Sequence, residues 1–192
     1  VSDENGNWSS TVSGGNGVAF FSSSQTREDG GTNNNNVIYD STTYNMDMDY
    51  DALKALFRTA SLVLDPKGNL MDIKPDTIVV KRGSSAFFRF QEIMGAVKRN
   101  RLHGGNDNDG SGIGDLKLIV LPYLANDAYW FAFDSSMKNQ MYGLQYKESQ
   151  PINLEGPHVV FKTGEIQYKS TMLFDIGHND YRSWFGSQGD NT

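Results

Sequence analysis

The sequence predicts an α+β fold, and three features of the chain support this class. Two segments carry apolar residues at helical spacing, and several others are β-branched or aromatic runs typical of strands. The helices and strands do not alternate strictly, which favours α+β over a parallel α/β sheet. With 192 residues, of which 38% are hydrophobic, the chain can bury one sizeable core.

The first part of the chain is predicted to be mostly loop. Residues 1–17 are rich in Ser, Gly and Asn, and we expect them to form an extended lead-in. Residues 18–21 are apolar and predict a short strand. Residues 22–36 are polar and end in a run of Asn. We expect an exposed loop there, because such a segment has little apolar surface to bury.

The first helix is predicted at residues 49–64. Its apolar stripe is formed by residues at helical spacing, namely Leu53, Leu56, Phe57, Ala60 and Leu64. Asp47, Asp49 and Asp51 lie at its start, where carboxylates accept hydrogen bonds from free amides and interact well with the helix dipole. The turn-forming residues 65–69 end the helix.

The middle of the chain predicts a buried strand followed by a second helix. Residues 77–80 form a β-branched run. Residues 84–99 predict a helix whose stripe is Phe87, Phe90, Met94 and Val97, which we interpret as core packing. Residues 100–114 predict another loop rich in Gly, Asn and Asp.

The last third is predicted to be rich in strands. Residues 116–121 and 129–133 predict two strands, and residues 144–147 a further short one. Residues 159–161 and 166–174 flank Thr163 and Gly164, a pattern typical of a hairpin.

Charge and cysteine content exclude some classes of function. The net charge is −6 and no extended basic patch is present, so specific nucleic-acid recognition is not expected. Cysteine is absent, which excludes disulfides, thiolate catalysis and Cys-ligated zinc. No apolar run approaches the roughly 20 residues of a membrane helix, so no membrane association is expected.

One segment resembles the start of a calcium-binding loop. Asp107, Asp109 and Ser111 stand at the first, third and fifth positions, and Gly112 at the sixth. The twelfth position would be Leu118, which lacks the bidentate carboxylate. The alternative is a surface loop made of turn-forming residues. His103, His158 and His178 are spread through the sequence, so only the fold could bring them together.

The residues 174–187 concentrate aromatic and charged side chains near the end of the given sequence. We predict Tyr181, Arg182, Trp184 and Phe185 as an interface anchor, because Trp, Tyr and Arg dominate binding hot spots. The alternative is that they close the core of their own domain.

The chain contains an ordered set of segments, which starts with Gly17-Val-Ala-Phe-Phe-Ser22. It continues with the helix and its turn (51–68), Ile73-Lys-Pro-Asp-Thr-Ile-Val-Val80, the strand pair 118–131, and residues 151–187 with Asp180-Tyr-Arg182 and Trp184. This set resembles, in the same order, segments of the Mu-like major head subunits of tailed bacteriophages with double-stranded DNA, in which the first segment reads G-V-A-L-F-S.

This resemblance implies the Hong Kong 97 phage capsid fold, comprising the axial domain and part of the peripheral domain. Residues 1–75 would be the peripheral-domain part with the polar loop and the first helix. Residues 76–144 would form the axial domain. Residues 145–192 would return to the peripheral domain with a long strand and a C-terminal anchor.

The function implied by the resemblance is that of a structural major capsid protein. Such a protein self-assembles in the host cytoplasm, as hexamers and pentamers, into the icosahedral shell of the virion. The shell encloses phage double-stranded DNA without sequence-specific binding. No enzymatic activity, catalytic residue or cofactor is expected. Two alternatives are an encapsulin-type nanocompartment shell protein and a β-rich, calcium-dependent extracellular binding module.

Overall fold

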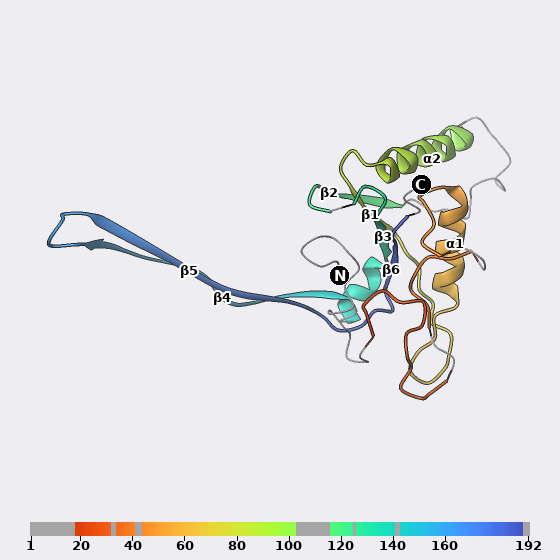
Figure 1. The fold of residues 1–192 in the computed structure, drawn as a ribbon, viewed down its shortest axis with the longest axis horizontal. Coiled ribbons are helices and arrows are strands. Elements are labelled where there is room, and N and C mark those ends of the chain that lie inside the picture. The colour runs from red at the N-terminus through yellow and green to blue at the C-terminus, as the bar shows by residue number, and fades with distance from the viewer. Residues whose placement is uncertain are drawn as a thin grey trace.

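The protein consists of a mixed α+β body and one long two-stranded arm (Figure 1). The computed structural model describes residues 18–31, 34–40, 44–102, 116–124, 126–140 and 143–189. With 19% helix and 39% strand, the chain belongs to the predicted α+β class.

A four-stranded sheet in the order β2-β1-β3-β6 forms the centre of the body. Its strands are β1 (Thr77–Lys81), β2 (Lys117–Leu121), β3 (Trp130–Phe133) and β6 (Trp184–Ser187). Strand β1 runs parallel to β2 and antiparallel to β3, and β6 runs antiparallel to β3. The outer edge of β6 is covered by residues 36–38, since the Ile38 amide donates to the Gly186 carbonyl at 3.0 Å. The predicted strands at 77–80, 116–121 and 129–133 are therefore confirmed.

Two helices lie beside the sheet. Helix α1 (Tyr50–Ser61) begins after Asp49, whose Oδ1 accepts a 2.6 Å hydrogen bond from the Ala52 amide. Helix α2 (Ser85–Leu102) follows Ser84, whose Oγ accepts a hydrogen bond from the Phe87 amide at 3.1 Å. Both predicted helices are thus present.

The first helix is shorter than expected. It ends at Ser61, and Leu64 instead forms an antiparallel bridge with Leu70 across the turn that begins at Asp65. The Asp65 carboxylate accepts from the amides of Lys67 and Asn69, both at 2.8 Å, and these bonds hold the turn. Local turn chemistry therefore takes Leu64 out of the helix.

The core lies between the two helices and one face of the sheet. Ile78 and Val80 of β1 are fully buried there, beside Trp130 of β3 and Phe185 of β6. The helices contribute the buried Leu53, Leu56 and Phe90 to the same cluster. This core takes residues from each of the three predicted chain divisions (1–75, 76–144 and 145–192), and the division itself stays a prediction.

The polar segment at 22–36 is partly buried, contrary to expectation. Asn36 is fully buried, and its side chain donates to the Phe20 carbonyl at 2.8 Å and accepts from the Ser22 amide at 2.9 Å. Gln25 is buried as well and donates to the Ala19 carbonyl at 2.8 Å. These polar groups are buried because hydrogen bonds satisfy them. The strand expected at 18–21 is absent, and only Ala19 forms an isolated bridge.

The arm consists of β4 (Leu144–Val159) and β5 (Ile166–His178), which pair antiparallel and leave the body (Figure 1). The short strand expected at 144–147 is thus the first quarter of a 16-residue strand. Pro151 and Pro157 lie inside β4, although proline is rare in the interior of strands. They fit because a two-stranded ribbon has free outer edges and because β4 is irregular around both of them.

Candidate assembly interface

Strand β5 is amphipathic along its whole length. Its alternate residues on one face are apolar or aromatic at most positions, namely Ile166, Tyr168, Met172, Phe174 and Ile176. The residues between them are mostly polar, namely Gln167, Lys169, Thr171 and Asp175, with Leu173 as the apolar exception. Because successive side chains of a strand point to opposite faces, one face of the arm is apolar.

The pairing register adds residues of β4 to this apolar face. Tyr146 is paired with Ile176, and Val159 is paired with Ile166 near the tip. The register shifts at three places, and each shift puts the additional residue on β4, which has 16 residues against 13 in β5. The bulges therefore bend β4 while β5 keeps its alternation.

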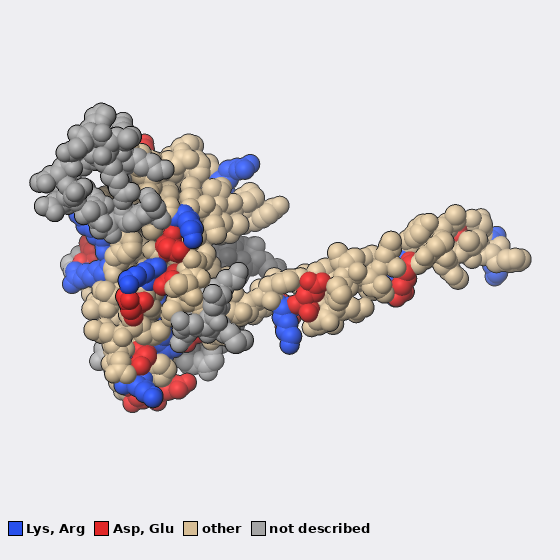
Figure 2. All heavy atoms as spheres, turned by 180° about the vertical axis from the view of Figure 1, so that it is seen from behind, with Lys and Arg blue, Asp and Glu red and all other residues tan. Residues whose placement is uncertain are grey.

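The apolar face of the arm is exposed to solvent. The exposed large apolar side chains of the arm are Leu144, Tyr146, Ile152, Leu154, Val159, Phe161, Ile166, Tyr168, Met172, Leu173, Phe174 and Ile176. Figure 2 shows the arm as a mostly uncharged projection, with a few acidic and basic side chains along it. Phe161 in the turn at the tip is 102% exposed.

Such a surface is unusual for a chain that acts alone. A single two-stranded ribbon is marginally stable in water, and contiguous exposed apolar patches mark sites of interaction. At about 3.3 Å per residue the 13 residues of β5 span about 43 Å, and two strands give a face about 10 Å wide. The apolar face of the arm is thus on the order of 400 Å².

The second apolar surface lies on the face of the body sheet that points away from the core. Ile119, Val79 and Phe131 line up across three strands there, because they are register partners. Phe133 stacks on Trp184 with ring centroids 4.5 Å apart. Together with Phe20, Phe21, Leu121, Leu124 and Leu144 these side chains line a groove of about 300 Å³, which we call the sheet groove.

The described residues cover the sheet groove only in part. The ring of Phe21 packs on Phe131 at 5.3 Å between centroids, which covers one part. Ile119 and Leu121 stay exposed on the edge strand β2, and so does Leu144 at the base of the arm. Leu144 therefore connects the apolar face of the arm with the sheet groove.

The four predicted anchor residues come together at the end of the described chain, where they pack mainly within the subunit. Phe185 is fully buried in the core, and Tyr181 and Arg182 are buried as well. The Tyr181 hydroxyl accepts from Asn34 Nδ2 at 3.0 Å, and Arg182 Nε donates to the Leu64 carbonyl at 3.1 Å.

These contacts favour the alternative in which the residues close their own domain. Trp184 is half-buried and borders the sheet groove. A role of the set in an interface stays a prediction.

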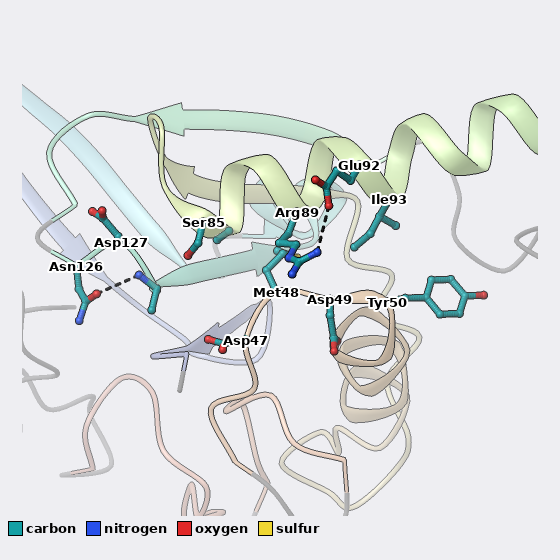
Figure 3. A pocket seen from close by; sticks show the side chains of 12 residues that line it. Asp47, Met48, Asp49, Tyr50, Ser85, Arg89, Glu92, Ile93, Asn126 and Asp127 are labelled. Atoms are coloured by element: carbon teal, nitrogen blue, oxygen red, sulfur yellow. Dashed lines mark hydrogen bonds and ion pairs between the residues drawn. The ribbon is translucent and has the colours of Figure 1, made fainter. Parts of the chain in front are cut away.

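A larger and more polar hollow of about 800 Å³ lies between the start of α1, the first turns of α2 and residues 126–128 (Figure 3). Arg89 in this hollow is paired with Glu92 at 3.3 Å. Asp49 is the helix cap, and Asp127 forms an ion pair with Lys81 at 2.8 Å. The charged groups there have structural partners, and no group of three metal-ligating side chains occurs among the described residues.

Of the other predicted site residues, only His158 and His178 lie in the described part of the chain. Asp107, Asp109 and Ser111 lie outside the described residues, as does His103. His158 lies towards the tip of the arm, and His178 lies at its base, where its ring packs against Phe20. Eleven residues of β5 separate their register positions, which is roughly 36 Å. The arm thus keeps these two histidines apart.

The arm and the sheet groove were not identified from the sequence as sites. The alternation from Ile166 to Ile176 was available as a signal for the apolar face of the arm. The sheet groove had no such signal, because its residues come from distant segments.

Comparison of the chain with protein-family models, with curated proteins and with solved structures finds no match. In the part of the chain that the structure describes, the helices are too short or too polar to cross a bilayer.

Proposed function

We propose that this chain is a structural subunit that self-assembles into an icosahedral shell around double-stranded DNA, as a major head protein of a tailed bacteriophage. The observation that carries the proposal is the amphipathic arm, whose apolar face has no cover within the described chain. A neighbouring subunit would remove this face from water.

The size of the apolar face favours a lattice over an isolated dimer. Two faces of about 400 Å² bury on the order of 800 Å² together, which is below the roughly 1,200 Å² of a stable standard interface. A contact of this size is weak by itself. It becomes effective when each subunit makes several contacts in a closed assembly, because later contacts form within the assembly and profit from a high effective concentration.

The charge of the chain fits a wall around DNA. With a net charge of −6, the subunit would enclose DNA without adhering to it by a basic face. The ordered resemblance to Mu-like head subunits supplies the finer part of the proposal, namely the Hong Kong 97 capsid fold and a place in the virion shell.

The proposal is tested by the assembly state of the purified full chain. We expect particles in negative-stain electron microscopy and a concentration-dependent rise of mass in light scattering. The double variant Tyr168→Glu with Met172→Glu places charges on the apolar face of the arm and should abolish assembly. The matched control, Gln167→Glu with Thr171→Glu, places the same charges on the polar face and should assemble.

A chain that stays monomeric at all concentrations and salt conditions would contradict the proposal. Equal assembly of the two double variants would show that the arm is not the contact surface. The ultraviolet spectrum of shells purified from expressing cells distinguishes nucleic acid from protein cargo, and protein cargo would favour a nanocompartment.

A further inference from the structure

The described residues leave two apolar surfaces without a cover, namely the distal end of the arm and the sheet groove. We propose that the distal end of the arm of one copy, with Phe161 at its tip, docks into the sheet groove of a second copy. The inference rests on the proposed function and names the contact through which the subunits assemble.

The arm of a molecule cannot reach the sheet groove of the same molecule. Leu144 is the first residue of β4 and lines this groove, so the arm starts there. The tip at Phe161 lies beyond the 13 paired residues of β5, about 43 Å away. Figure 1 shows the arm leaving the body without folding back.

A second copy of the chain is the occupant that satisfies both surfaces at once. Each copy offers the exposed Phe161 at its tip and one apolar groove, so a head-to-tail contact uses one of each per subunit. Arm-to-arm pairing around a twofold axis would leave every sheet groove open. A heterologous contact repeats from subunit to subunit and closes into rings when its rotation permits, as a shell requires.

The shapes and the polarity of the two surfaces agree. The groove of about 300 Å³ has room for a few large side chains, but it is too small to hold the whole apolar face of the arm. Phe161, fully free of neighbours at 102% exposure, is flanked by the exposed Val159 and Ile166. The residues that line the groove are all apolar, so Phe161 can enter it while the charged side chains of Lys162 and Glu165 at the tip stay in solvent.

Disulfide trapping in the full chain tests this contact. The chain contains no cysteine, so engineered cysteines are the only thiols. Phe161→Cys is mixed with Leu121→Cys under mild oxidation, and a disulfide forms only when the two β-carbons approach to about 4 Å. We expect a covalent dimer from the mixture, and a ladder of covalent oligomers from the variant that carries both substitutions.

The control replaces Leu121→Cys with Lys67→Cys, which lies in an exposed turn away from the sheet groove and should give no dimer. Ile119→Cys, on the same wall of the groove, serves if Leu121→Cys fails to fold. A disulfide dimer of Phe161→Cys alone, without the mixed product, would overturn the inference in favour of arm-to-arm pairing.

Light scattering on the same samples separates this inference from the proposed function. If particles assemble but no mixed disulfide forms at either groove position, the docking of the arm into the sheet groove is overturned. The shell proposal would still stand. Mixed disulfides in open chains or small rings, without shells, would support the docking and overturn the shell. Monomers without mixed disulfides would overturn both.

Discussion

At the scale of single residues, buried polar side chains hold the loops of this protein in place. Asn36 and Gln25 connect segments that lack regular structure, and each of their buried polar groups has a partner. Asp134 is buried beside β3 and accepts from the amides of Lys74 and Ser136 at 2.8 and 2.9 Å. The burial of such groups is favourable only while every hydrogen bond is made.

The replacement Asn36→Ala should destabilise the body by about 2–3 kcal/mol, because it leaves the buried Ser22 amide and Phe20 carbonyl without this partner. The free energy of unfolding is measured by urea denaturation followed by tryptophan fluorescence. Asn153→Ala on the exposed arm is the matched control and should change it very little. Equal effects of the two substitutions would contradict the structural role of Asn36.

The carboxylate of Asp76 makes the stability of the body dependent on pH. Burial raises the pKa of Asp76, but hydrogen bonds from Ser135 and Thr77 and the Lys117 ammonium lower it by more, so its pKa lies below the ordinary value of 3.8. A lowered pKa in the folded state contributes stability that is present above 3.8 and is lost as the pH falls through the folded pKa.

Asp76→Asn should therefore be less stable than the unmodified chain at neutral pH, and the difference should narrow at about pH 3. Urea midpoints at the two pH values measure this. Glu165→Gln at the exposed tip of the arm is the control and should not alter the pH dependence. A constant difference between Asp76→Asn and the unmodified chain would show that the carboxylate charge is not responsible.

At the scale of elements, caps and turns set the ends of the helices in the body. The alternation of apolar and polar side chains makes one face of the arm apolar. Asp49 caps α1, and the Asp65 turn redirects the chain soon after its end. Strand β5 keeps a regular alternation, whereas β4 absorbs two prolines at irregular positions. The caps and turns were readable in the sequence, whereas β4 was predicted far too short, at residues 144–147.

Asp49→Ala should destabilise the body by about 1 kcal/mol, because the first turn of α1 loses its capping bond to the Ala52 amide. Thermal unfolding followed by circular dichroism measures the change. The matched control is Asp51→Ala, which loses an exposed ion pair with Lys54 and should change the stability much less. An effect of Asp51→Ala as large as that of Asp49→Ala would contradict the capping role.

At the scale of the whole molecule, the body and the arm are separate structural units. The two strands of the arm pair only with each other in the described chain, and no residue of the arm belongs to the core cluster. Trp130 and Phe185 are fully buried in a core cluster that consists of body residues alone. Under the proposed function, another subunit would cover the exposed apolar surface of the arm.

Replacement of residues 146–176 by a short Gly-Asn turn should leave the thermal unfolding of the body nearly unchanged and should abolish assembly. The reason is that the removed residues contribute nothing to the core cluster. Circular dichroism and light scattering of the same preparation measure the two properties. The control is the insertion of the same Gly-Asn sequence after Thr163, at the tip of the intact arm. If the body unfolds without the arm, the arm contributes to the stability of the body, and the two are not separate units.

The sequence by itself determined the α+β class, the two helices, three of the four body strands and the amphipathic character of β5. These properties depend on neighbours a few residues apart, so periodicity and turn residues report them. Only the tertiary structure decided that Asn36 is buried, that Phe185 closes the core, and that residues from Phe20 to Trp184 share one groove. These contacts join segments as far apart as Asn34 and Tyr181, which are 147 positions apart, and no local pattern encodes such a pairing.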